Sequence, residues 1–382
     1  MNREKEIKIK ENESIFNSKL PSVIVDYAFI ATFLSIFVLN NNSSLSTYPT
    51  TRLINLILTL ILLGLLFISA FDEIKLYPKM YLLLFATIVI SLIVLFVRSY
   101  VNFHWIYLCY IVFMVSSDIK INIKVKKYVV YLSFLFVVYQ LATFRFLGTV
   151  PVLSWIDPNY SGYYIFMFSI FSKNSGFKKI SVALILLGLL TLSRTYILAI
   201  IIFLLFDNIE YLKQLVFKFK LAEFFRLMII SLVVVMIIGS LFIASDKKRS
   251  HFSDRGIERI FSVDDLSNLY RFTANKKFAD SILSNPSYYF FGVNTVDYQF
   301  DVFMNTPHNS FLALIVNYGI FFAFPFILIY GMSFNKLFTK DNVPLIISHF
   351  IFYSFLGAGI QGFPGLLLFY TLREKGISSL KT

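Results

Sequence analysis

The sequence predicts an all-α, polytopic integral membrane protein with about 10–12 transmembrane helices and one long extracytoplasmic loop. Of its 382 residues, 57% are hydrophobic and 15% are charged, whereas soluble proteins average about 45–50% and 25%. The apolar residues form long runs, and the mean hydropathy is +0.72. This composition excludes a soluble enzyme and a nucleic-acid-binding module, and Cys109, as the one cysteine, excludes a disulfide scaffold.

A helix needs about 20 mostly apolar residues to cross the hydrocarbon core. Clear candidates lie near 22–39, 53–71, 79–97, 101–116, 128–147, 224–244 and 308–331. The stretch 160–206 is too long for one span, and lysines and then Ser193-Arg194-Thr195 divide it into segments near 160–172, 180–192 and 196–206. The last two are short, so we expect them to be tilted or paired around a buried polar turn. The Gly-rich run 343–372 predicts two further short helices.

The distribution of Lys and Arg predicts the orientation, because these residues concentrate in short cytoplasmic loops. Loops assigned to the inside hold 23 of the 35 Lys and Arg residues, and the short outside loops hold only Arg52, Arg98, Arg145 and Arg194. The basic N-terminus lacks a cleavage pattern, so we expect it to stay in the cytoplasm. The predicted organisation is a cytoplasmic tail (1–21), a first helix bundle (22–244), an extracytoplasmic loop (245–306), further helices (307–372) and a cytoplasmic tail (373–382).

The net charge of +13 then reflects basic cytoplasmic loops and anionic lipid headgroups, and we expect no nucleic-acid partner. The location predicted from this pattern is a cell membrane, which the chain crosses several times with its N-terminus in the cytoplasm. Within the long loop, 267–284 has a helical pattern, and Pro286 and Gly292 predict a break.

Arg194 is the most informative polar residue of the predicted outer face, since it interrupts an apolar stretch with only Ser193 and Thr195 beside it. It could be a snorkelling or capping arginine. The alternative is a bidentate anchor for a phosphate group, a role that suits a planar guanidinium better than an ammonium. For Arg271, in the outside loop, a solvated arginine and a phosphate ligand are both open interpretations.

Two further polar motifs lie on the predicted outer face. Asp157-Pro158-Asn159 precedes an apolar run and predicts a helix cap with proline in the first turn, which is compatible with holding a substrate. His308 lies where a polar loop enters a helix, so it is a candidate cap or a candidate general base. His349, in contrast, lies inside a predicted span with no acidic neighbour at helical spacing.

Motifs for cofactors and metals are missing from the sequence. It has no phosphate-binding loop, no Gly-rich dinucleotide turn and no cluster of metal ligands, so we expect no cofactor and no metal. The first outside loop, 40–52, contains no acidic residue, which argues against metal-dependent lipid-sugar transferases. Positive charge for a phosphate-bearing substrate would therefore come from arginines.

These residues, taken in order, resemble the O-antigen polymerase and O-antigen ligase superfamily, bacterial membrane glycosyltransferases that act on polyprenyl-pyrophosphate-linked glycans. The resemblance covers 140–330 and rests on Arg145, Asp157-Pro158-Asn159, Ser193-Arg194-Thr195, Arg271 and His308-Asn309 followed by Gly319. The family pattern continues with Gly or Leu three positions after that glycine, where this chain has Phe322. This departure favours a polymerase over a ligase.

The resemblance implies a GT-C-like, metal-independent and inverting glycosyltransferase. It implies that Arg194 and Arg271 bind the donor pyrophosphate and that His308 acts as the general base. The residues implied to shape the site are Arg145, Asp157, Asn159, Ser193 and Asn309. The implied partners are lipid-linked oligosaccharides, membrane lipid and a chain-length regulator. The alternatives are a ligase-type transferase and a lipid-linked oligosaccharide flippase or other transporter, which should show internal repeats or broken helices.

Overall fold

Helices occupy the predicted apolar segments in the computed structural model, which describes residues 22–34, 49–71, 77–98, 104–117, 120–142, 146–147, 150–151, 158–217, 286–292, 310–355 and 363–379. The first half comprises α2 (Ser22–Leu34), α3 (Pro49–Ala70), α4 (Pro78–Arg98), α5 (His104–Ser116), α6 (Ile123–Ala142), α7 (Pro158–Asn174), α8 (Lys178–Leu189), α9 (Arg194–Asn208) and α10 (Glu210–Phe217). The second half comprises α14 (Pro286–Phe291), α16 (Ser310–Leu337), the short 3-10 helix η4 (Lys340–Asn342), α17 (Val343–Phe355) and α18 (Phe363–Ser379). The predicted span 224–244 lies outside the described residues.

Two described helices are long and apolar enough to cross a membrane, namely Ile123–Ala142 and Tyr318–Leu337. A third span results if α9 and α10, which bend by 97° at their junction, count as one segment. Three shorter apolar helices accompany them, at Ile57–Ala70, Pro78–Ile93 and Ile106–Ser116. The described part of the chain is therefore that of a helical membrane protein, and the count of 10–12 spans stays a prediction.

The segment predicted as a span over 128–147 differs from the structure. Helix α6 begins earlier, at Ile123, and ends at Ala142. Asn122 caps this earlier start, because its Oδ1 accepts a hydrogen bond from the Lys124 backbone N–H at 2.9 Å. In the first turn, the Lys126 ammonium forms an ion pair with Glu374 of α18. Beyond the helix, β1 (Phe146–Leu147) pairs antiparallel with β2 (Val150–Pro151) over two residues each. The described chain is otherwise helical, which confirms the all-α prediction at that level.

Ion pairs gather several helix ends at one end of the bundle, which we call the lysine-rich end. The pairs are Lys126–Glu374, Lys173–Asp207 and Lys340–Glu210. The amide of Asn342 joins the end of α16 to that of α18 by donating to the carbonyls of Leu337 and Leu372, each at 2.7 Å. Helices α7, α9, α16 and α18 therefore all end here, and α6 begins here.

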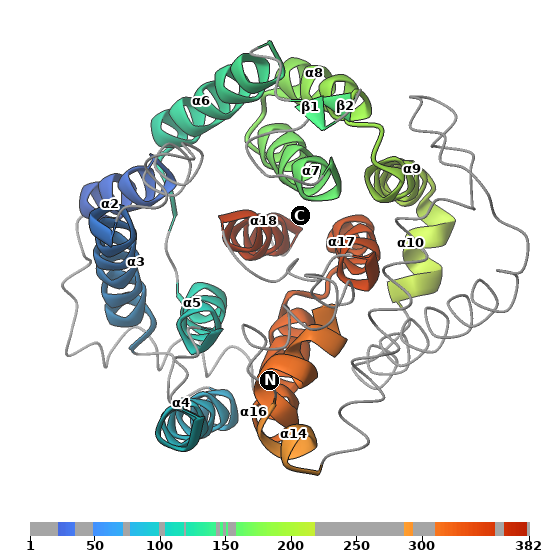
Figure 1. The fold of residues 1–382 in the computed structure, drawn as a ribbon. Coiled ribbons are helices and arrows are strands. Elements are labelled where there is room, and N and C mark those ends of the chain that lie inside the picture. Colours follow the sequence, from blue (N-terminus) through green and yellow to red (C-terminus); the bar gives the residue numbers. More distant parts are fainter. Residues whose placement is uncertain are drawn as a thin grey trace, which may run out of the picture.

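Helix α18 occupies the middle of the bundle, with α5, α7, α16 and α17 around it (Figure 1). Its residues Leu367 to Leu372 are buried, as are most side chains of α5. Along α16, an aromatic series at four-residue spacing turns toward this core and comprises Tyr318, Phe322, Phe326 and Tyr330. Phe322, which departs from the family pattern, is fully buried in this series, so packing accounts for a large side chain there.

Pro286 and Gly292 bound the short helix α14, where the sequence had predicted only a break. Proline suits the first helical position, and Gly292 follows the helix with φ of +78°. Helix α14 packs on α16 at Gly319, whose backbone leaves the helical region (φ 71°, ψ 171°) and kinks α16. A side chain at Gly319 would collide with the Phe290 carbonyl, which explains why glycine is required there.

Candidate functional site

A polar break separates α8 from α9 where the sequence predicted it. The chain turns through Leu190–Leu192, and Leu192 adopts a positive φ of 48°, which is uncommon for a residue other than glycine. Ser193 then caps α9, because its Oγ accepts a hydrogen bond from the Tyr196 backbone N–H at 3.2 Å. Backbone strain of this kind often marks functional turns, so the geometry singles out the Ser193 turn.

The start of α7 lies directly against this turn. Helix α7 begins at Pro158, which confirms the predicted proline in the first turn. The next residue, Asn159, accepts a hydrogen bond through its Oδ1 from the Ser193 Oγ at 2.7 Å. Both side chains are buried, with exposed fractions of 7% and 2%. Two residues that are 34 positions apart are thus in direct contact, as expected for parts of one site.

Two glycines allow α7, α8 and α9 to approach closely around Tyr196. A Cβ on Gly162 of α7 would lie 2.7 Å from the Tyr196 Cβ, and a Cβ on Gly188 of α8 would overlap the Tyr196 ring. The Tyr196 hydroxyl donates to the Ile185 carbonyl of α8 at 3.0 Å. The α7–α8–α9 junction is therefore held by tight packing as well as by the Ser193 hydrogen bonds.

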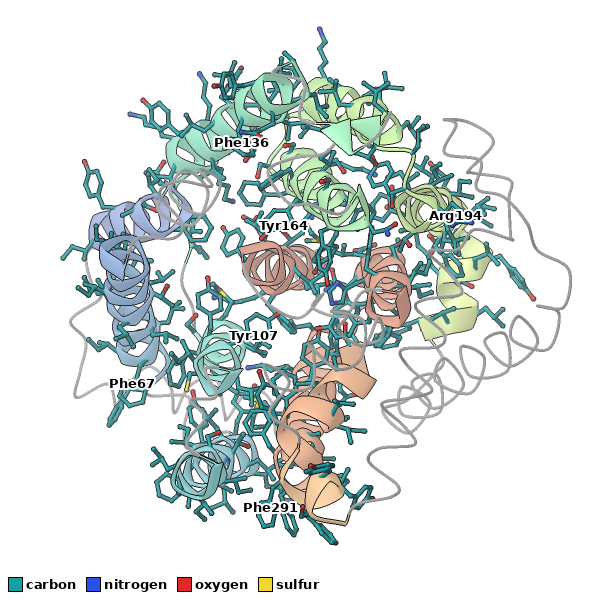
Figure 2. All side chains as sticks on the ribbon, in the orientation of Figure 1. Phe67, Tyr107, Phe136, Tyr164, Arg194 and Phe291 are labelled. Carbon is teal, nitrogen blue, oxygen red and sulfur yellow. The ribbon has the colours of Figure 1, made fainter. Side chains whose placement is uncertain are left out.

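Arg194 is the first residue of α9, and its side chain is half-buried. Figure 2 shows it on α9 at the periphery of the bundle, on the opposite side from Phe67. Helices α7 and α9 both end at the lysine-rich end, so Arg194 lies at the other end, about 22 Å away along a helix of 15 residues. Helix N-termini carry partial positive charge. Two such termini and one guanidinium make this end of α7 and α9 suited to an anion.

The other predicted site residues lie outside the described residues. They are Arg145, Asp157, Arg271, His308 and Asn309. A helix does begin at Ser310, as predicted from the polar loop that enters an apolar run, and Ser310 is 1% exposed. Of the predicted set, the structure brings Asn159 and Ser193 into contact, with Arg194 next to Ser193 in the chain, and the positions of the other five stay predictions.

His349 is a buried polar residue that the sequence gave no reason to select. It lies in α17 with both ring nitrogens in hydrogen bonds, Nδ1 to the Tyr163 hydroxyl at 3.1 Å and Nε2 to the Tyr330 hydroxyl at 2.9 Å. Its partners are 186 and 19 residues away along the chain. The only signal in the sequence was a histidine within an apolar helix, where an unpaired imidazole would be costly.

Among the residues that the structure describes, no three His, Cys, Asp or Glu side chains lie together so as to hold a metal ion. Comparison of the chain with known protein families, curated proteins and solved structures found no match. The interpretation of the site therefore depends on its geometry and on the pattern of residues in the sequence.

Proposed function

We propose that the protein is a glycan polymerase of the bacterial cytoplasmic membrane. In this proposal it transfers a growing glycan from polyprenyl pyrophosphate to an incoming lipid-linked oligosaccharide repeat unit. The observation that carries the proposal is the contact between Asn159 and Ser193, which joins the starts of α7 and α9 and fixes the residue next to Arg194. A substrate with a pyrophosphate group suits this end, because two helix N-termini and a guanidinium favour multiple negative charges.

The reaction is a displacement at the anomeric carbon of the donor sugar. A hydroxyl oxygen of the acceptor sugar forms the new bond to that carbon, and the bond from the carbon to the pyrophosphate oxygen breaks with inversion. His308 takes the proton of the attacking hydroxyl, a role that contributes about 10²–10⁴ in rate where it has been measured. The electron pair leaves with the polyprenyl pyrophosphate.

Arg194 and Arg271 are proposed to neutralise the leaving pyrophosphate. Negative charge develops on its oxygens as the bond breaks, so a preorganised donor stabilises the transition state more than the bound substrate. One such donor contributes about 3 kcal/mol in enzymes where it has been removed. Arg145, Asp157, Asn159, Ser193 and Asn309 would shape the site around the two substrates.

The proposal also sets the orientation in the membrane. The lysine-rich end faces the cytoplasm, since Lys and Arg concentrate on that side. The tail 1–21 is then cytoplasmic, and Ser193 and Arg194 face the outside, where lipid-linked repeat units are polymerised. We propose 10–12 spans in a GT-C-like arrangement, with membrane lipid and a chain-length regulator as further partners.

A transporter is the second candidate, because the 97° bend between α9 and α10 could be the broken helix of a transporter. Broken helices that bind transported substrates lie near the middle of the bilayer. The α9–α10 bend instead follows Asp207, which pairs with Lys173 at the lysine-rich end. Its position at one end of the bundle therefore favours the transferase.

The decisive experiment is the size profile of surface and lipid-linked glycan in cells that lack the protein, compared with cells that carry it. We expect a ladder of chain lengths with the protein and a single repeat unit without it. Long chains retained on the lipid carrier would identify a ligase. An unchanged profile would overturn the polymerase and favour the transporter.

Variants of Arg194 test the mechanism in the same assay. Arg194→Ala should abolish the ladder, and Arg194→Lys should restore only part of it, because an ammonium cannot form the bidentate contact. Lys179→Ala is the matched control, since Lys179 is exposed at the start of α8 and should leave the ladder intact. A normal ladder from well-expressed Arg194→Ala protein would remove Arg194 from the mechanism. Purified protein in liposomes with the lipid-linked repeat unit should stay active with EDTA.

A further inference from the structure

The His349 imidazole is fully buried within the described bundle, since the residue is 0% exposed. It joins three helices, since His349 belongs to α17, Tyr163 to α7 and Tyr330 to α16. The rings of Tyr353 and Phe334 also pack on it, with centroids 4.3 and 6.1 Å from the imidazole. Apolar packing would not require a histidine here, so its two hydrogen bonds are the feature to be explained.

The two hydrogen bonds to His349 satisfy a neutral imidazole completely. Neutral imidazole has one donor and one acceptor nitrogen, and a tyrosine hydroxyl can fill either role. One tyrosine therefore donates to the ring while the other accepts from it. The imidazole is surrounded by apolar helices, so losing either tyrosine hydroxyl would leave a buried polar atom unpaired. This energetic penalty holds α7, α16 and α17 in the arrangement that keeps both hydrogen bonds.

Tyr163 connects this contact to the candidate site. It lies four residues after Asn159 on α7, one helical turn away, and the two side chains engage different helices. Asn159 binds Ser193 of α9, Tyr163 binds His349 of α17, and α17 itself packs along α9. The first two turns of α7 are therefore held by α9 and by α17, and their position sets where Ser193 and Arg194 lie.

We propose that His349 is a positioning residue for the Ser193–Arg194 site, acting through Tyr163. The effect on enzyme activity that follows from this proposal rests on the proposed polymerase function. The geometric part is independent of that function, since it states that the His349–Tyr163 hydrogen bond fixes α7 on α17, which packs on α9, and so keeps Asn159 against Ser193.

The two tyrosines provide a matched pair of variants. Tyr163→Phe and Tyr330→Phe each remove one hydroxyl from His349, and both side chains are 1% exposed. A purely structural role would make the two variants equivalent. A positioning role makes Tyr163→Phe worse, because Tyr330 lies on α16 and does not touch α7 through this contact. We expect kcat to fall about 10- to 100-fold in Tyr163→Phe, with KM changed less than about twofold, and Tyr330→Phe to retain most of kcat.

Cross-linking tests the geometry without any glycan. In a Cys109→Ala background, the pair Asn159→Cys and Ser193→Cys should form a disulfide under mild oxidation, because the native side chains are in contact. Adding Tyr163→Phe should slow its formation about five- to tenfold, the change that loss of one buried hydrogen bond produces. Adding Tyr330→Phe should not slow it.

Substitution of His349 gives the rescue control. His349→Gln retains a donor and an acceptor and should preserve more cross-linking and turnover than His349→Leu, which retains neither. Equal cross-linking rates in Tyr163→Phe and Tyr330→Phe would overturn the positioning role. A difference in cross-linking with no polymerase activity in any variant would instead support the positioning of α7 and refute the proposed function.

Discussion

The hydrogen bond between Ser193 and Asn159 can be measured as a coupling free energy. Ser193→Ala removes two interactions, the cap of α9 and the bond to Asn159. Loss of a serine cap costs about 1 kcal/mol. Interhelical hydrogen bonds in a membrane protein average about 0.6 kcal/mol and reach about 1.7. We therefore expect Ser193→Ala to lower the free energy of unfolding by about 2 kcal/mol.

A double-mutant cycle separates the two interactions. Asn159→Ala removes the interhelical bond and leaves the cap, so its combination with Ser193→Ala should show a coupling of about 0.6–1.7 kcal/mol. The assay is reversible denaturant unfolding of the purified protein in detergent micelles. Ser133→Ala is the control, since the buried Ser133 hydroxyl only donates to the Val129 carbonyl of its own helix and its loss should cost little.

Two outcomes would refute this reasoning. A coupling within error of zero would mean that the Ser193–Asn159 contact does not hold α7 against α9. A Ser193→Ala variant no less stable than Ser133→Ala would mean that neither the cap nor the contact contributes.

Two further predictions concern the kink of α16 and the lysine-rich end. Gly319→Ala should lower the free energy of unfolding by about 1–3 kcal/mol, because the φ and ψ of Gly319 are nearly exclusive to glycine. It should also make α14 more sensitive to protease. Gly64→Ala is the control and should change neither, since a Cβ at Gly64 would have nothing within 4 Å. Lys126→Ala should destabilise the protein by about 1–2 kcal/mol in thermal unfolding, between the values for exposed and buried pairs, since the partly buried Glu374 loses its cation. Adding Glu374→Ala should restore part of that loss, and a double variant worse than the single one would contradict an ion-pair role.

The sequence predicted features that depend on neighbouring residues. The break at Ser193-Arg194-Thr195 was visible because three polar residues interrupt an apolar run, and α9 begins at Arg194 as a result. Pro158 predicted the start of α7 because proline is favoured in the first turn. The GT-C-like arrangement was inferred from the family resemblance, and His308 was placed at a helix start because a polar loop precedes an apolar run there; both stay predictions.

Features that depend on tertiary contacts were not visible in the sequence. The sequence showed His349 inside an apolar helix but not what it binds, because its partner Tyr163 is 186 residues away and tyrosine is common in this chain. The glycine at 319 was noted as part of a motif, but its cause, the approach of the Phe290 backbone, depends on how α14 packs. The ion pair between Lys126 of α6 and Glu374 of α18 was not visible either, because the two residues are 248 positions apart.

The use of serine at 193 has an electrostatic consequence. Aspartate caps helices about as well as serine, so capping alone does not require a hydroxyl. A carboxylate at that position could not donate to the Asn159 Oδ1, and its charge would cancel much of the positive potential beside Arg194. The hydroxyl satisfies both α9 and Asn159 while remaining neutral. Serine therefore joins the starts of α7 and α9 by hydrogen bonds without adding negative charge. The positive potential of the two helix N-termini is kept, as a site for a pyrophosphate would require.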